Sequence, residues 1–156
     1  MEIDESKLKR VKRDGIVAII INNGRVLLLK RRNIPFLTNP GIWFFITGGR
    51  KKGEKYIETA YREIREEVGI EKQMLWKLYE CKVKLYDGAK KWVWKNRCFI
   101  FYSKSRKVKL NIENSAYKWV GIKDLKKETD FSKILINKRF VINKIEGFLN
   151  GNRSKA

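Results

Sequence analysis

The sequence predicts a single α/β domain in which strands and helices alternate along the chain. Its 156 residues suit one hydrophobic core and are too few for two independent ones. Hydrophobic residues make up 43% of the chain, so there is enough apolar material for a folded domain. Segments with the period of a strand interleave with segments that have the period of a helix. We expect the domain to span residues 1–151, with a frayed tail at 152–156.

The first half of the chain predicts a β-hairpin, a loop and an aromatic strand. The run GIVAIII, which begins at Gly15, and the run RVLLLK are joined by Asn22-Asn23-Gly24, a sequence typical of a tight hairpin turn. Residues 33–41 contain two prolines and predict a loop. The loop leads into the aromatic strand IWFFI, which we expect to end in a turn at Gly48-Gly49.

The second half predicts a helix, a longer hairpin, a short strand and a closing helix. Apolar residues recur at helical spacing over 55–68, and Gly69 stands where a left-handed C-cap is expected. The extended runs LWKLYECKVKLY and WVWKNRCFIFY are connected through Asp87-Gly88. Residues 117–120 predict a short strand. The closing helix ends before Asn150 and carries the apolar stripe Phe131, Leu135, Ile142, Ile145 and Leu149.

The charged and sulfur-containing residues limit the possible chemistry. The chain has no His, which excludes imidazole-based triads and makes most zinc and copper sites improbable. Cys81 and Cys98 are far apart in sequence and outside any C-x-x-C pattern, so we expect them to be buried, reduced and inert. Hydrolytic chemistry would then depend on carboxylates, Lys, Tyr, Cys or metals bound by oxygen.

The charge balance predicts an anionic partner. Lys and Arg number 37 against 17 Asp and Glu, a formal charge of +20, which attracts nucleotides, RNA or acidic membranes. Simple solvation of the surface is the competing interpretation of this excess. The N-terminus lacks the apolar region of a secretory signal and no apolar run approaches the roughly 20 residues that span a bilayer. We therefore expect a cytoplasmic protein that does not enter the membrane.

Several carboxylates gather on the polar face of the predicted helix. Glu63, Glu66 and Glu67 stand at positions i, i+3 and i+4, and Glu54 precedes the helix. Like charges at this spacing repel one another by a few tenths of a kcal/mol per pair. A bound cation would remove that penalty, and Mg²⁺ or Mn²⁺ bound to oxygen ligands can bridge to phosphate oxygens. The cluster therefore predicts a site for a metal-bound pyrophosphate.

The spacing around these carboxylates resembles a known family signature. The segment GGRKKGEKYIETAYREIREEVGI, Gly48 to Ile70, fills each position of the signature of the Nudix hydrolases. This resemblance implies an α/β/α sandwich with a mixed sheet and a loop-helix-loop catalytic motif. It also implies hydrolysis of a nucleoside diphosphate linked to another moiety, with a divalent metal, Mg²⁺ or Mn²⁺.

The resemblance also implies roles for individual residues. Glu63, Glu66 and Glu67 would be metal ligands, and Arg62 with Glu54 would form the internal ion pair of the motif. Gly48 would belong to its first turn, and the carbonyl group of the preceding residue, Thr47, would bind metal as well. The Pro-Gly that usually precedes the signature glycine is replaced here by Ile46-Thr47. Thr resists positive φ far more than Gly does, so the local turn is expected to differ.

A weaker resemblance concerns the substrate. Glu113 in the segment ENSAYKWVGIKDL resembles a glutamate of the asymmetric diadenosine tetraphosphate hydrolases within the family, and it competes with Glu63 for the role of general base. Two nucleosides would need two stacking surfaces, which Trp43, Tyr86, Trp92 and Trp94 could offer if they are not occupied in strand packing. The expected substrate-binding residues are Arg32, Trp43, Arg50, Lys52, Tyr86, Lys90 and Lys91.

Other functions stay open from the sequence. The basic residues fit an RNA 5′ end as well as a four-phosphate chain, so an RNA 5′-end pyrophosphohydrolase is an alternative. A hydrolase of nucleoside triphosphates or ADP-ribose is another. A third is an RNA-binding module with a vestigial motif, although binding alone would not need an acidic cluster in a basic protein. The sequence leaves the oligomeric state undetermined.

Overall fold

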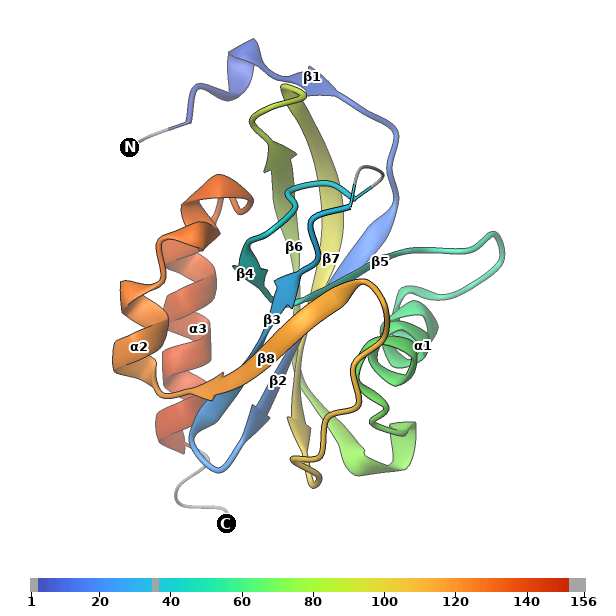
Figure 1. The fold of residues 1–156 in the computed structure, drawn as a ribbon, viewed down its shortest axis with the longest axis vertical. Coiled ribbons are helices and arrows are strands. Elements are labelled where there is room, and N and C mark those ends of the chain that lie inside the picture. The colour runs from blue at the N-terminus through green and yellow to red at the C-terminus, as the bar shows by residue number, and fades with distance from the viewer. Residues whose placement is uncertain (1–2, 35–36, 152–156) are drawn as a thin grey trace.

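The computed structural model describes residues 3–34 and 37–151, so the predicted tail at 152–156 lies outside the described residues. Within these residues, eight strands and three α-helices follow one another, and three short 3₁₀ turns accompany them (Figure 1). The strands are β1 (Lys9–Arg10), β2 (Gly15–Asn22), β3 (Arg25–Arg31), β4 (Trp43–Phe44), β5 (Ile46–Gly49), β6 (Leu75–Asp87), β7 (Trp92–Ser103) and β8 (Asn114–Val120). The helices are α1 (Tyr56–Val68), α2 (Ile122–Lys127) and α3 (Lys138–Gly151).

All eight strands belong to one mixed sheet, as predicted. β2 pairs in parallel with β7 and antiparallel with β3 and β5. β6 continues the sheet beyond β7, and β4 and β8 pair with β3. The predicted first hairpin is confirmed: Asn23 and Gly24 connect β2 and β3 with positive φ values of 47° and 73°.

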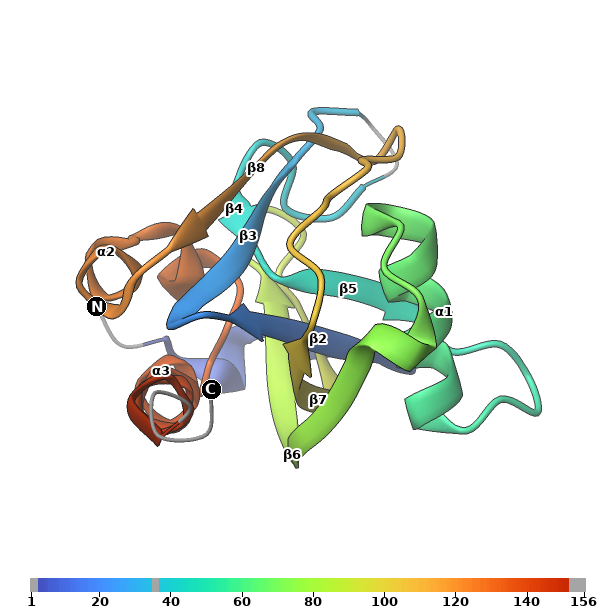
Figure 2. The same ribbon diagram turned by 90° about the horizontal axis from the view of Figure 1, so that it is seen from below.

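The helices cover the sheet from both sides, which confirms the predicted sandwich. In both views α1 lies on one side of the sheet and α2 and α3 lie on the other (Figures 1 and 2). Alternate residues of β2 supply the two cores: Ile16, Ala18 and Ile20 pack toward α1, whereas Val17, Ile19 and Ile21 pack toward α3. The central strand is therefore buried on both faces.

The aromatic strand predicted at IWFFI is two strands, and the prediction of one was wrong. Phe44 and Phe45 are both buried, although consecutive residues of a regular strand face opposite sides. The ring of Phe45 stacks on Phe131 with centroids 5.0 Å apart, and the chain changes its pairing partner from β3 to β2 there. As a result, Gly48 and Gly49 lie inside β5 and not in a turn after it.

The C-terminal region also differs from the prediction. Phe131 belongs to a 3₁₀ turn, and the segment around Leu135 pairs with the edge of β6, with a 2.9 Å hydrogen bond from Tyr86 N to Ile134 O. Helix α3 therefore begins only at Lys138, and it extends through Gly151 instead of ending before Asn150. The apolar stripe predicted for a single helix belongs to two elements, the 3₁₀ turn and α3, because both contribute residues to the same core. The short helix α2 was not predicted, and β8 begins three residues earlier than expected, at Asn114.

The two cysteines are neighbours in space. Cys81 of β6 lies directly opposite Cys98 of β7, and both are free thiols. Cys98 is buried as predicted, but Cys81 is only half-buried. Their separation in sequence was misleading because the long hairpin brings its two arms back together.

Candidate active site

Helix α1 presents its carboxylates because its opposite face is buried. Ala60, Ile64 and Val68 pack against the sheet, and Gly69 ends the helix in the left-handed conformation with a φ of 74°. The polar face therefore turns toward β5 and the loop that precedes the helix. This fixed rotation of the helix determines where each glutamate of the motif lies.

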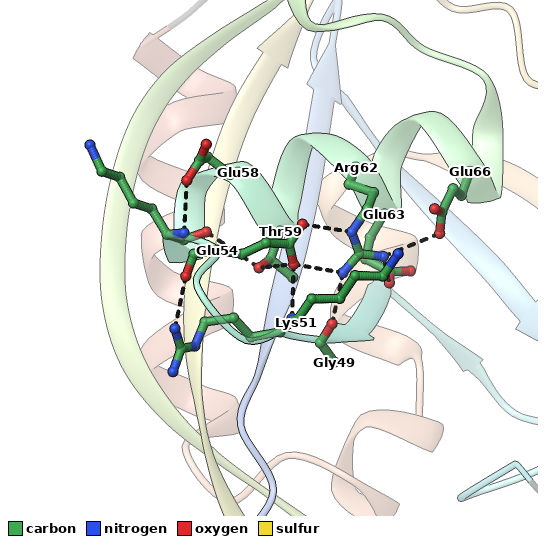
Figure 3. Close-up of polar contacts among 10 residues, drawn as sticks. Gly49, Lys51, Glu54, Glu58, Thr59, Arg62, Glu63 and Glu66 are labelled. Carbon is green, nitrogen blue, oxygen red and sulfur yellow. Dashed lines mark hydrogen bonds and ion pairs between the residues drawn. The ribbon is translucent and has the colours of Figure 1, made fainter.

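Arg62 connects the acidic residues of the motif (Figure 3). Its Nε and Nη2 donate to the two carboxylate oxygens of Glu54 at 2.8 and 2.9 Å. Its Nη1 donates to Glu63 at 2.8 Å and to Glu66 at 3.3 Å, and Nη2 also donates to the carbonyl oxygen of Gly49 at 2.9 Å. One guanidinium group thus ties the start of the helix, its centre and β5 together, and the Arg62–Glu54 pair expected from the motif is present.

Glu54 is held as a carboxylate. Besides Arg62, it accepts a 2.9 Å hydrogen bond from the backbone N–H of Lys51 and a 3.0 Å bond from the Thr59 hydroxyl. These interactions, with the Arg62 hydrogen bonds as the largest contribution, lower the pKa of Glu54 from 4.5 to about 2. Glu54 is therefore ionised at neutral pH and holds the turn before α1 in that form.

Gly48 is required for space. Its backbone is regular strand, paired with Ile16, but a Cβ added there would collide with the carboxyl group of Glu63. Thr47 is extended as well and pairs with Val17, so replacement of the usual Pro-Gly by Ile46-Thr47 needs no positive φ at Thr47. The expected difference in the turn is therefore a continuous strand, and Gly48 in that strand lies against the side chain of Glu63.

Glu67 is the most deeply buried carboxylate of the cluster, with only 2% of its surface exposed. Its Oε1 accepts a 3.0 Å hydrogen bond from Asn114 Nδ2, while its Oε2 is buried with no donor among the described residues. Burial is the main cause that raises the pKa of Glu67 well above 4.5, and it also raises the pKa of the neighbouring Glu63. A buried and a partly buried carboxyl group in contact favour a proton or a cation between them.

The oxygen atoms around Glu63 and Glu67 fit a divalent cation. The unpartnered Oε2 of Glu67 and the adjacent carboxyl group of Glu63 are the hard donors that such ions select. Across residues 3–34 and 37–151, however, no three acidic side chains converge closely enough to hold a metal together. Glu66 lies apart from Glu63 and Glu67, since its side chain is 45% exposed and forms an ion pair with Arg62.

A short segment before β8 brings a fourth carboxylate to the site. Asn111 accepts a 3.1 Å hydrogen bond from the backbone N–H of Glu113, which forms a tight turn. Arg32 holds this turn: its Nε donates to Ile112 O at 2.7 Å and its backbone N–H to Glu113 O at 2.8 Å. Glu113 is thereby placed close enough to Glu67 for their charges to interact.

The site opens into a pocket of about 230 Å³. Glu63 and Glu113 line it together with Thr47 and Gly48, so both candidates for the general base face the same space. The pocket also has an apolar side built mainly from Leu85, Trp94 and Ile134. Its other lining residues are Arg13, Asp14, Gly15, Arg31, Leu37, Thr38, Gly49 and Asn96.

The seven residues predicted to bind substrate are not among those that line this pocket. Arg32 holds the turn at Glu113, and Arg50 bonds to Asp14 at 2.6 Å. Tyr86 is buried and its hydroxyl group donates to Ser132 O, whereas Lys118 covers the ring of Trp43 at 4.2 Å. Lys52, Lys90 and Lys91 are exposed, with Lys90 over the ring of Trp92. A substrate contact with any of these residues stays a prediction.

Arg31 lines the pocket, and no motif in the sequence singles it out. It is 92% buried, with hydrogen bonds of 2.9 Å from Nε to Thr38 O and from Nη1 to Thr47 Oγ1. Among the described residues it forms no ion pair, and burial lowers its pKa against the opposing effect of the charges of Glu67 and Glu113. A cationic side chain next to acidic groups in an open pocket is suited to hold a phosphate.

Comparison with known proteins agrees with this geometry. Residues 11–138 match the NUDIX domain family model. The chain is 34% identical over 122 residues to the nucleoside triphosphatase NudI of Escherichia coli O139:H28, covering 73% of this chain and 85% of that protein. The fold matches that of a Caenorhabditis elegans Ap4A hydrolase in a binary complex, with a TM-score of 0.72, 21% identity and coverage of 89% of this chain and 98% of that one.

A second structural neighbour carries another activity on the same fold. The E. coli dihydroneopterin triphosphate pyrophosphohydrolase aligns with a TM-score of 0.64 and 21% identity, covering 93% of this chain and 99% of that one. Nudix hydrolases generally use divalent metal ions and bind nucleotide substrates. With the family model spanning most of the chain and the Arg62-centred motif intact, the chain belongs to the Nudix hydrolases, enzymes that act on phosphoric anhydride bonds.

Proposed function

We propose that this protein is a divalent-metal-dependent pyrophosphohydrolase whose preferred substrates are dinucleoside polyphosphates, with diadenosine tetraphosphate cleaved to ATP and AMP. The observation that carries the proposal is the meeting of Glu63 and Glu113 in one pocket with Arg31 beside them. This arrangement supplies two carboxylates to take a proton and one cation to hold a phosphate.

The residues in and beside the pocket have different roles in the proposed hydrolysis. Glu63, Glu67 and the β5 carbonyl groups would hold Mg²⁺ or Mn²⁺, with Glu66 at the rim, and the bound ion would neutralise the phosphate oxygens. Arg31 orients the phosphate chain from the opposite side. Glu63 or Glu113 accepts a proton from the water that attacks phosphorus, and the bridging oxygen leaves with the departing nucleotide.

Two indole rings that share Arg13, one of them in the wall of the pocket, support a substrate with two nucleosides. Trp94 lines the pocket, and Arg13 lies over it at 5.1 Å from the ring centroid and over Trp92 at 5.8 Å. Lys90 stands over Trp92 at 4.9 Å. A nucleoside on each ring, with a polyphosphate passing Arg13, would use both flat faces and the basic side chains between them.

A nucleoside triphosphate is the second candidate. Within the described part of the chain, Trp94 is the only aromatic side chain that lines the pocket, which suits a single base. The relative with 34% identity is named a nucleoside triphosphatase, which favours the same class. The two candidates differ in whether a second nucleoside improves turnover.

Product analysis with Mg²⁺ decides between them. The panel contains diadenosine tetraphosphate, ATP, GTP, ADP-ribose and a 5′-triphosphorylated RNA, with Glu67→Gln as the inactive control. Faster conversion of the first to ATP and AMP supports the proposal, whereas faster attack on the triphosphates replaces it with the second candidate. Preference for RNA, or RNA binding without any turnover, would contradict both.

A further inference from the structure

Asn96 is a buried polar residue in the pocket that takes no part in the proposed hydrolysis. It lies on β7 with 7% of its surface exposed, and its Nδ2 is buried without an acceptor among the described residues. A buried amide without a partner is destabilising, and such groups in folded proteins usually have a ligand or water to bond. Since Asn96 lines the pocket, a ligand bound there can provide that partner.

We propose that Asn96 recognises the nucleobase of the substrate and that Trp94 forms the flat wall of the same subsite. The inference rests on the proposed nucleotide substrate and adds the position of the base and the residue that reads its edge. Asn96 and Trp94 are two residues apart on β7, so their side chains lie on the same face of the sheet.

The pairing of strands places Asn96 between the catalytic residues and the apolar wall. Asn96 pairs with Gly15 of β2, and Gly15 pairs with Gly49 of β5. A Cβ added at Gly15 would collide with the carbonyl oxygen of Gly48 and would come within 2.9 Å of Asn96 Oδ1. A side chain at position 15 would therefore not fit between Asn96 and Gly48, the residue that lies against Glu63.

The opposite side of Asn96 is apolar. Leu85 of β6 is the cross-strand partner of Trp94, and Ile134 joins them through the segment that pairs with the edge of β6. A phosphate or a ribose would gain little from such a wall, whereas an aromatic base gains stacking and burial. The polar and apolar sides thus predict phosphate near Arg31 and base near Trp94.

The amide of Asn96 specifies what kind of base edge it can read. A carboxamide offers one acceptor and one donor side by side, and rotation about χ2 exchanges them. The N6 amino group and N7 of adenine form the complementary pair, which is the usual partner of an Asn side chain. We therefore expect adenine to bind better than guanine, whose O6 and N7 are both acceptors.

The test measures binding of AMP, GMP and ribose 5-phosphate by calorimetry. Wild-type protein is expected to bind AMP about tenfold more tightly than GMP, a ratio typical of one base contact. Asn96→Leu, which keeps the size of the side chain, should bring that ratio to within about twofold and leave ribose 5-phosphate binding unchanged. Asn96→Asp, which keeps an acceptor for N6 but loses the donor, should weaken AMP binding and still favour AMP over GMP.

The control is Asn22→Leu. Asn22 is a similarly buried Asn on β2, but its Nδ2 donates to Ser103 O at 2.8 Å and it does not line the pocket. Its replacement should lower the melting temperature and preserve the AMP to GMP ratio. Retention of that ratio in Asn96→Leu, or an equal loss of ribose 5-phosphate binding, would overturn the inference. Failure of the proposed function would be seen separately, as absent turnover by the wild-type enzyme.

Discussion

Asn114 donates a 3.0 Å hydrogen bond to Glu67, and both side chains are 2% exposed. The bond joins the start of β8 to the end of α1, two segments 47 residues apart in sequence. The bond fixes Oε1 of Glu67. The other oxygen, Oε2, has no donor among the described residues and is the one expected to bind a cation. Asn114 is therefore a positioning residue for the carboxylate expected to hold metal.

Replacement of Asn114 by Leu should weaken metal binding more than it weakens the fold. Loss of a residue that orients a metal ligand typically lowers metal affinity by about 10- to 100-fold. We expect the Mg²⁺ concentration for half-maximal activity to rise by that factor, with a parallel loss of Mn²⁺ binding followed by electron paramagnetic resonance. An unchanged Mn²⁺ affinity would contradict the positioning role.

Gly48→Ala should abolish activity while preserving the sheet. The added methyl group would occupy the position of the Glu63 carboxyl group, which would have to rotate away. Gly49→Ala is the matched control, because a Cβ there meets no atom within 4 Å. A difference of about 100-fold or more in kcat between the two variants is expected, with similar circular dichroism spectra. Equal activity of the two would refute the steric argument.

Glu54→Gln should destabilise the protein in a pH-dependent way. The pKa of Glu54 is lowered from 4.5 to about 2 in the folded state, so ionisation of this group stabilises the fold above about pH 4.5. That contribution is lost as the pH falls from about 4.5 toward 2. Urea unfolding should show a large difference between variant and wild type at neutral pH and a smaller one near pH 3. If the difference in the free energy of unfolding instead increased as the pH fell, the stabilising role of the ionised Glu54 would be contradicted.

Arg32→Ala should lower activity through Glu113. Without the side chain of Arg32, the turn at 111–114 loses its 2.7 Å bond at Ile112 O, and Glu113 is no longer held in the pocket. If Glu113 is the base, kcat should fall as in Glu113→Gln, with little change in KM. The double variant should fall no further than either single one, whereas additive losses would show that Arg32 acts elsewhere. Arg25→Ala, with one 3.5 Å bond to Trp119 O, serves as the control.

Cys81 should react with alkylating reagents well before Cys98. A hydrogen bond with Cys98, followed by the charges of Lys144 and Arg97, lowers the pKa of the half-buried Cys81 thiol. The contact with Cys81 and burial raise the pKa of Cys98. Mass spectrometry after limited iodoacetamide treatment should find Cys81 modified first. Preferential labelling of Cys98 would mean that the hairpin opens in solution.

The sequence predicted the elements whose signals are local. The hairpin at Asn23-Gly24 and the helix ended by Gly69 depend on backbone preferences of a few adjacent residues. The division of IWFFI into two strands depends on Phe131, 86 residues after Phe45, and no local pattern records that contact. The same holds for the apolar stripe that passed from the 3₁₀ turn into α3.

The ion pair of Arg62 and Glu54 could be predicted from the sequence because the motif fixes the separation between the helix and the turn before it, and the pair is present. The bond from Arg62 to Glu63 was not predicted, and the role of Glu63 as a metal ligand or base stays a prediction. The substrate residues could not be assigned, since the pocket draws on β2, β3, β6 and β7 at once. The position of Asn96 next to Gly15 is a result of strand register, which is set by packing across the whole sheet.

Arg31 and Arg32 are adjacent in the chain, and their side chains extend to opposite sides of the backbone. Arg31 reaches Thr47 and the pocket, while Arg32 reaches Ile112 and the turn that carries Glu113. The pairing of β3 with β8 shifts between Lys30 and Arg31, so this division depends on an irregularity at the end of the strand. An insertion or deletion of one residue before Arg31 would exchange the directions of the two arginines. If the inserted or deleted residue is neutral, the protein would keep its charge and every functional side chain and still lose its active site, which makes the length of this strand as constraining as the identity of its residues.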